Sequence, residues 1–433
     1  MIVDSNSFYR CRFYSTYLSR KGLQAGSTPD LIMLIVREKL SGRPWPPEVP
    51  ADLDVSSIAI LSARLLLDLS PATVAARRYE QELVRNHLRM LYSVREDRYT
   101  IVTGSSPEPL IAEASAQMMN YVLPNSIRYM NLWTLLEKFI DHGLAWQGAV
   151  GELIGRALSI SAMDRAINHL THIRELRYQS PIAVTDYYKA LLTDEAWGQL
   201  RRSIPANRAN LSAMSAGKTF EDAFKYAYFH FSHYGQANDA SPIRDTCAWA
   251  YWLRGTAIVC QLNQELTDRM IPMYFPAHGN VSPRSTSANL DQDKTGESVN
   301  PIHVATQSAE DLSLFSRGNK LPYIAAVHCY ALTENQGLIV QEQPPYELRA
   351  QKIDIEAPRY QIDFRGLEAY DCITNAEKAT IRGLINRSKN VLFENHPRKY
   401  GVPSVRRMLP VLSDEPACTE WFGGYKQVEA WNT

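Results

Sequence analysis

Two short stretches in the second half of the chain carry residue types that could do metal-assisted chemistry together. The segment Thr267–Pro276 reads TDRMIPMYFP, so that Asp268 stands just before a short apolar run. The segment DQDK begins at Asp291 and contains Gln292-x-Lys294. Carboxylate oxygens are ligands that Mg²⁺ prefers, and a lysine can stabilise negative charge that develops during a reaction. The two stretches are either parts of one site or unrelated fragments of an ordinary fold.

Two further acids lie on a predicted helix. Glu152 stands four residues before Arg156, and at this spacing the two side chains most simply form an exposed pair worth about 0.2–0.5 kcal/mol. Asp164 stands eleven residues after Leu153 and therefore points along the apolar stripe of the same helix. A carboxylate in that position needs a partner or a metal.

Three other motifs have simpler structural explanations. Gly217-Lys218-Thr219 is similar to the end of a phosphate loop, but the first glycine of that loop is missing, so a turn leading into a helix is favoured. His230 and His233 have a spacing that could share a metal on a helix, yet they lie among aromatic residues, which favours packed histidines. No G-x-S-x-G or H-E-x-x-H motif is present in the sequence.

The elements that must position these residues predict a mixed α/β fold. Helical patterns dominate the first half, in VSSIAILSARLLLDL, in SSPEPLIAEASAQMM and in the segment that contains Glu152. Several β-like runs appear past Met270, and we expect a central mixed sheet that contains Met270–Phe275, Tyr323–Leu332, Leu338–Gln341 and Tyr360–Phe364.

The polar composition of Gly279–Asn300 predicts a flexible loop. A Thr374-x-x-Glu377 capping box predicts one more helix near the end of the chain. We expect an N-terminal tail over residues 1–30, a mainly helical region over 31–202 and an α/β region over 203–433.

The composition is that of a folded protein whose charges cancel. Of the 433 residues, 45% are hydrophobic, and Lys plus Arg equal Asp plus Glu at 46 each. Because no net charge attracts phosphate backbones, nucleic-acid binding would need a local basic patch. No run approaches the roughly 18 apolar residues of a membrane span, which predicts no membrane partner.

The cysteines predict an intracellular protein, cytoplasmic or nuclear. None forms a C-x-x-C pair, so free thiols are expected at all six positions, Cys11, Cys247, Cys260, Cys329, Cys372 and Cys418. The first residues contain Arg and Ser with a single acid, Asp4, a pattern weakly typical of an organellar transit peptide. An ordinary polar tail is the simpler interpretation.

The order of several segments resembles that of large, functionally uncharacterised proteins of mushroom-forming (basidiomycete) fungi. The likeness runs from about Leu31 to Trp421 and is carried by SSPEPLIAEA, GELIGRALSISAMDRA, KYAYFHFSHY, WLRGTAIVCQLNQELTDRMIPMYF and DQDKTGESV. In that family the segments that match TDRMIPMYF and NLDQDK resemble an Asp-containing strand followed by an apolar strand ending in Gln-x-Lys. This pairing is similar to the core of the restriction-endonuclease-like (PD-(D/E)XK) superfamily.

The resemblance implies a Mg²⁺ site with four residues in named roles. Asp268 would be a metal ligand, Gln292 would take the place of the usual Glu, and Lys294 would be the lysine that stabilises developing charge. Glu152 would be the helix acid and a second metal ligand.

The segment ANLDQDK departs from the apolar central strand that the resemblance implies. Asn289, Asp291 and Asp293 share one face, and burying three polar groups would be costly. Either the strand lies at an exposed edge or the site has decayed. We therefore expect a catalytically degraded nuclease-like protein that binds nucleic acid or another protein. The alternatives are an active Mg²⁺-dependent nuclease and a non-enzymatic scaffold whose KYAYFHFSHY segment docks a partner.

Overall fold

The fold is described from a computed structural model of the chain. The structure describes residues 29–69, 74–94, 101–145, 150–171, 177–208, 211–237, 245–261, 267–295, 320–333, 336–341 and 357–389.

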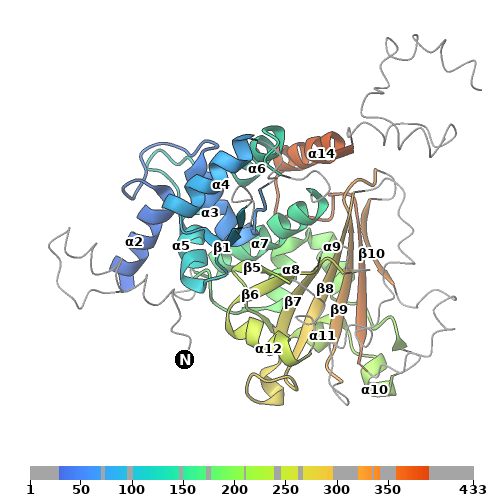
Figure 1. Cartoon of the computed structure of the whole chain (residues 1–433). Helices are drawn as coiled ribbons and strands as arrows, with labels where there is room; N and C mark the ends of the chain where they lie inside the picture. The colour runs from blue at the N-terminus through green and yellow to red at the C-terminus, as the bar shows by residue number, and fades with distance from the viewer. Residues whose placement is uncertain are drawn as a thin grey trace, which may run out of the picture.

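The N-terminal half is mainly helical, as the sequence predicts (Figure 1). A two-stranded hairpin of β1 and β2 interrupts the helices. Asp54 begins α3 with a capping box, because its side chain accepts from the Ser57 backbone N–H while the Ser57 hydroxyl bonds the Asp54 N–H. The elements are α2 (Pro29–Ser41), α3 (Val55–Leu65), α4 (Val74–Asn86), β1 (Met90–Val94), β2 (Ile101–Gly104), α5 (Pro109–Met119), α6 (Leu132–Asp141) and α7 (Val150–Thr171).

The second half is built on a mixed sheet. The described strands run in the order β10-β11-β9-β8-β7-β4-β3, and β6 pairs with both β7 and β5. β7 is antiparallel to β6 and β8, whereas β8, β9 and β11 are parallel to one another. The strands are β3 (Ile182–Ala183), β4 (Tyr228–Phe229), β5 (His233–Gln236), β6 (Thr256–Val259), β7 (Arg269–Tyr274), β8 (Thr286–Lys294), β9 (Tyr323–Cys329), β10 (Gly337–Gln341) and β11 (Arg359–Arg365).

Helices cover both faces of this sheet. α7 lies between the helical part and one face of β8, and α12 packs on β6, β7 and β8 (Figure 1). The capping box that the sequence predicts at Thr374 is confirmed, because the Glu377 carboxylate accepts from the Thr374 N–H at 2.7 Å. The remaining helices are α8 (Val184–Leu191), α9 (Asp194–Leu200), α10 (Ala213–Ala216), α11 (Phe220–Phe224), α12 (Asp245–Leu253), the 3₁₀ turn η4 (Pro276–His278) and α14 (Asn375–Lys389).

The four strands predicted from β-like runs are confirmed as β7, β9, β10 and β11, with ends that differ by at most three residues. The prediction of a flexible loop over residues 279–300 is wrong for β8, which is a buried strand between β7 and β9. The expected exposed edge is wrong for the same reason. Residues 296–300 lie outside the described part of the chain.

The turn that precedes β8 is also ordered by specific hydrogen bonds. The Tyr274 hydroxyl donates to the Gly279 carbonyl at 2.7 Å, and the Ser285 hydroxyl donates to the Asn280 carbonyl at 2.6 Å. Short polar side chains can fold a turn in this way by bonding nearby backbone groups. The polar composition of this segment therefore reflects turn chemistry.

The aromatic segment KYAYFHFSHY contributes to the hydrophobic core. Phe229, Phe231 and Tyr234 are buried, and Tyr187 on α8 packs edge-on against Phe229 and Phe231. One continuous core joins α3 and α7 to the sheet. Of the Tyr and Phe side chains in this segment, only Tyr226 is exposed, so little aromatic surface is left for the docking that the scaffold alternative predicts.

Candidate functional site

The β7–β8 hairpin brings Asp268 and Gln292 to the same end of the sheet. Arg269 pairs with Asp291 in the antiparallel register, so Asp268 and Gln292 are the next residues beyond that pair. The Asp268 N–H donates to the Asp291 carbonyl at 2.9 Å, and the Asp268 carbonyl accepts from the Cys260 N–H at 2.8 Å. Hydrogen bonds on both sides therefore fix the backbone of Asp268 between β6 and β8.

The Asp268 carboxylate forms no ion pair among the described residues. Its Oδ2 accepts from the Asp293 N–H at 2.6 Å, but no basic side chain of the described residues forms an ion pair with it. Burial, together with the negative charges of Asp293 and Glu152, raises the pKa of Asp268 to about 7, although the hydrogen bond from the Asp293 N–H and the charge of Lys294 act to lower it. A buried acid with such a pKa is a candidate functional group.

Gln292 and Lys294 lie together on one face of β8, because side chains two residues apart on a strand share a face. Gln292 is buried, and its Oε1 has no hydrogen-bond partner. Lys294 is half-buried at the end of the strand and forms no described ion pair. The end of β8 thus carries an oxygen acceptor without a hydrogen-bond donor, in Gln292, and a cation without a described ion-pair partner, in Lys294.

Glu152 approaches this end of the sheet from α7. It lines a cavity of about 280 Å³. Burial raises the pKa of Glu152, and the Arg156 charge opposes the shift, while Asp293 adds to it. No hydrogen bond joins Glu152 to Asp268 among the described contacts, so the two acids affect each other only by repulsion between their negative charges. The described residues that line the cavity are Leu67, Asp68, Phe139, Ala145, Val150, Glu152, Leu153, Arg156, Gln236, Val259 and Cys260.

The predicted exposed pair of Glu152 and Arg156 is wrong. Arg156 is 5% exposed, and its guanidinium donates to the Leu65 and Leu66 carbonyls at 2.7 and 2.8 Å. These carbonyls lie at the C-terminal end of α3, where backbone oxygens lack helical partners. Arg156 therefore closes the end of α3, and Glu152 is left to face the cavity.

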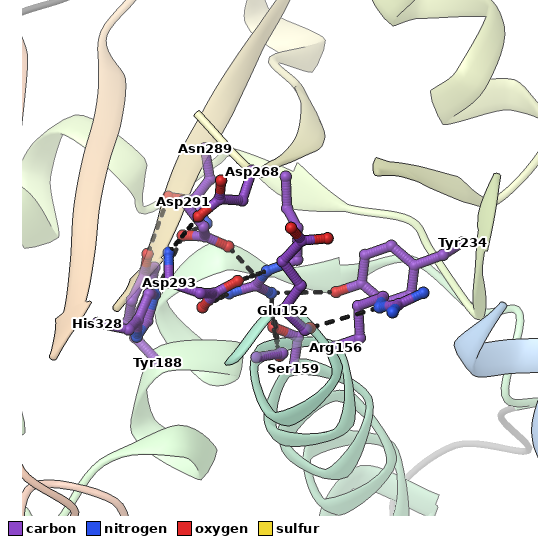
Figure 2. Close-up of polar contacts among 12 residues, drawn as sticks. Glu152, Arg156, Ser159, Tyr188, Tyr234, Asp268, Asn289, Asp291, Asp293 and His328 are labelled. Atoms are coloured by element: carbon purple, nitrogen blue, oxygen red, sulfur yellow. Dashed lines mark hydrogen bonds and ion pairs between the residues drawn. The ribbon is translucent and has the colours of Figure 1, made fainter. Parts of the chain in front are cut away.

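Arg269 is the residue of this region that the sequence patterns did not single out. It is fully buried and pairs with Asp293, with Nε to Oδ2 at 2.8 Å and Nη2 to Oδ1 at 3.0 Å. Its Nη1 lies 3.4 Å from the Asp291 carboxylate and donates to the Gly155 carbonyl and the Ser159 hydroxyl of α7. Figure 2 shows Asp268, Asp291 and Asp293 gathered beside the α7 residues Glu152, Arg156 and Ser159.

A chain of hydrogen bonds extends this network across the sheet. The Tyr330 hydroxyl donates to Asp293 at 2.6 Å, and His328 lies 3.3 Å from Asp291 and 2.7 Å from the Tyr370 hydroxyl. Burial acts to raise the pKa of Asp291, but the Arg269 charge and the His328 hydrogen bond keep it below its ordinary value. The polar face of β8 can be buried because Arg269, Tyr330 and His328 provide hydrogen bonds and charge to its carboxylates.

The oxygen donors at the hairpin end suit a weakly held divalent cation. No group of three or more His, Cys, Asp or Glu side chains among the described residues is arranged to hold a metal. Mg²⁺ nevertheless uses one or two protein carboxylates together with water and substrate oxygens. The Asp268 carboxylate and the unpartnered Gln292 amide oxygen provide such a partial set, and Glu152 adds negative charge nearby.

The remaining candidates have structural partners. Asp164 needs a partner, as predicted, and finds it in Arg64, with two N–O distances of 2.6 Å. His233 is buried between the hydroxyls of Ser232 and Thr256, which confirms a packed histidine. Gly217 ends α10 and Thr219 caps α11, which confirms the turn leading into a helix.

The four cysteines in the described part are free thiols, as predicted. Cys11 and Cys418 lie outside the described residues. None of the helices described is both long enough and apolar enough to cross a membrane.

Comparison with known proteins places one domain on the chain. A profile of a domain of unknown function (DUF8736) matches residues 50–183. The match includes α7 with Glu152 and ends before the strands that carry Asp268 and Lys294. No curated protein and no solved structure matches the chain.

Proposed function

We propose that this protein is a divalent-cation-dependent phosphodiesterase that acts on nucleic acid, with its site at the hairpin end of β7 and β8. The observation that carries the proposal is the position of Asp268. It is a half-buried carboxylate without an ion-pair partner among the described residues, beside the strand end where Gln292 and Lys294 share a face. This arrangement agrees with the roles that the resemblance to restriction-endonuclease-like proteins implies.

Each residue has a defined task in this proposal. Asp268 and the Gln292 amide oxygen would hold the cation, and Glu152 would add charge from α7. When bound, a divalent cation polarises the phosphate and lowers the pKa of its water. Lys294 would stabilise negative charge on the phosphate oxygens. The main-chain bonds of Asp268 to β6 and β8 keep its carboxylate in place.

The burial of β8 favours an active nuclease over a catalytically degraded one. The degraded alternative rested on ANLDQDK being a poor strand, and β8 is instead a buried strand at the centre of the sheet. Arg269 neutralises Asp291 and Asp293 on the α7 face, whereas Asp268 keeps no basic partner among the described residues. The active alternative therefore has the stronger support.

A cleavage assay tests the proposal directly. The purified chain is incubated with labelled single- and double-stranded DNA and RNA oligonucleotides in Mg²⁺ or Mn²⁺. We expect cleavage that EDTA abolishes, and a loss of about 100-fold or more in the Asp268→Ala, Lys294→Ala double variant, because both the cation ligand and the charge-stabilising group are removed.

A matched double variant controls for general effects of the substitutions. Glu195→Ala with Lys189→Ala removes an acid and a lysine that are both exposed, and it should cleave like the wild type. Equal cleavage by the Asp268/Lys294 double variant would assign the activity to another site or to a contaminant. If the wild type cleaves none of the oligonucleotides, the degraded alternative holds.

A further inference from the structure

The carboxyl ends of three parallel strands lie next to the proposed site. In the register of β8, β9 and β11, Lys294 pairs with Cys329, and Cys329 pairs with Arg365. Paired residues of neighbouring strands point to the same face, so the side chains of Lys294 and Arg365 project on one side with Cys329 between them. In sheets of parallel strands, ligands bind outside these carboxyl ends.

Lys294 and Arg365 are close enough to act on one anion. Two strand spacings separate them, which amounts to roughly 10 Å between their backbones. Both side chains are long, and both charges reach Cys329: burial raises the pKa of its thiol to about 11, Asp363 adds to the shift, and Arg365 and Lys294 oppose it. The two cations therefore share one electrostatic environment.

The guanidinium of Arg365 has no hydrogen-bond or ion-pair partner among the described residues. The residue is half-buried, its backbone pairs with β9 and β10, and the Nε of its side chain is buried without a hydrogen-bond partner. A buried donor without a partner is uncommon and indicates a missing acceptor. Other arginines of the fold, such as Arg64 and Arg269, use their guanidinium groups on carboxylates and carbonyls.

A glycine holds the backbone at this strand end. Gly366 has a φ of +68°, and a Cβ there would lie 2.8 Å from the Leu332 carbonyl oxygen. The Gly366 N–H donates to the Cys329 carbonyl at 2.9 Å, so the chain turns immediately after Arg365. This turn fixes the direction in which Arg365 leaves β11.

We infer that Arg365 is a substrate-binding residue that holds a phosphate of the nucleic-acid backbone beside Lys294. A planar guanidinium with free donors suits two phosphate oxygens, and Lys294 contributes a point charge to the same or the adjacent phosphate. The inference rests on the proposed function, because it places the substrate at the end of β8. It adds a β11 residue to a site whose other members come from α7, β7 and β8.

A binding assay without hydrolysis tests this inference. Fluorescence anisotropy follows a labelled double-stranded DNA oligonucleotide in Ca²⁺, at several salt concentrations, with wild-type protein and Arg365→Gln. We expect about tenfold weaker binding by the variant, since one charge-assisted contact is lost. The slope of log affinity against log salt should fall by about one, because one fewer phosphate is neutralised.

Two further variants separate a phosphate contact from a general change. Arg365→Lys keeps the charge and should keep the salt slope. Arg78→Gln removes an exposed arginine of α4 and should bind like the wild type. If Arg365→Gln keeps the wild-type affinity and slope, or if the wild type does not bind the oligonucleotide, the inference is overturned.

Failure of the two proposals can be distinguished. Salt-sensitive binding that depends on Arg365, without cleavage in Mg²⁺, would support the phosphate contact and overturn the hydrolytic function. Cleavage in Mg²⁺ together with binding that does not depend on Arg365 would support the hydrolytic function and overturn the phosphate contact. Competition by inorganic phosphate as strong as that by unlabelled oligonucleotide would make free phosphate the ligand, which also overturns the inference.

Discussion

Asp268 shows at the scale of one residue how a carboxylate that is largely removed from water can cost stability. Burial raises its pKa to about 7 from a reference of 3.8, so its charged form is disfavoured in the folded protein. The penalty is absent below the reference value, where folded and unfolded states are both protonated. It grows as pH rises from there and is complete above about 7.

Replacing Asp268 by Asn should therefore stabilise the protein at alkaline pH. We expect the free energy of unfolding to rise by about 1–2 kcal/mol at about pH 8 without divalent cations, because the disfavoured charge is removed. At about pH 4 we expect little change, because Asn keeps the oxygen that accepts from the Asp293 N–H. Urea denaturation at both values measures the effect. Glu195→Gln, an exposed acid, serves as the control. Destabilisation by Asp268→Asn at alkaline pH would contradict this account.

His233 gives a second pH dependence of the opposite kind. Burial lowers its pKa to about 3 from a reference of 6.5, so the folded state keeps it neutral while the unfolded state takes up a proton. Stability should therefore fall as pH drops below about 6.5, by up to about 1.4 kcal/mol per pH unit.

The comparison of His233→Gln with the wild type isolates this contribution. The unfolding free energy of the variant should depend less on pH between about 7 and 5, whatever its absolute value. The exposed His169 is the matched site, and His169→Gln should keep the wild-type slope. An unchanged slope in His233→Gln would show that His233 takes up a proton without unfolding.

β8 is the element on which the proposed site depends, and Arg269 makes its burial possible. Asp291 and Asp293 are 3% and 8% exposed, and both lie within ion-pair distance of Arg269. Without Arg269 their charges would remain buried without compensation. Breaking such a buried pair from one side typically costs about 3–5 kcal/mol.

We predict that Arg269→Met destabilises the protein by about 3–5 kcal/mol in denaturant unfolding. Arg165→Met breaks the half-exposed pair with Asp371 and should cost only about 0–1 kcal/mol. Partial recovery of stability on adding Asp293→Leu to Arg269→Met would identify unpaired charge as the cause, since only Asp291 then remains without Arg269. Equal effects of the two arginine variants would contradict a special role of Arg269.

At the scale of the whole molecule, the helical part and the sheet share one core. Arg64 on α3 pairs with Asp164 on α7 and donates through Nε to the Ser232 carbonyl at 2.8 Å. Asn120 donates to the same carboxylate at 2.6 Å. The pair therefore joins α3, α5 and α7 to the chain that leads into β5.

Asp164→Asn should consequently weaken both parts at once. The charge of Arg64 loses its partner while it is 0% exposed, and we expect about 3–5 kcal/mol of destabilisation. Hydrogen exchange in mild denaturant should show α3 and β8 losing protection together. Asp52→Asn breaks the exposed pair with Lys138 and is the control. Loss of protection in α3 alone would show that residues 31–202 form a separate unit, as the sequence predicts.

Local chemistry allowed the sequence by itself to determine several elements. The Thr374 capping box, the Pro at the start of α5 and the apolar stripe of α7 each act within a few residues, so their consequences could be predicted without the fold. The apolar runs that became β7, β9 and β11 were recognisable for the same reason. The need of Asp164 for a partner also followed from its place on an apolar stripe.

Only the tertiary structure decided that β8 is a buried strand and which residues of the candidate site lie near one another. The strand looks unsuitable in the sequence because Asn289, Asp291 and Asp293 share a face, and the groups that compensate them come from β7, α7 and β9. The nearness of Asp268 to Gln292 depends on the hairpin register, and that of Lys294 to Arg365 depends on β9 lying between their strands. Burial of a charge is settled by partners distant in sequence, which no local pattern contains.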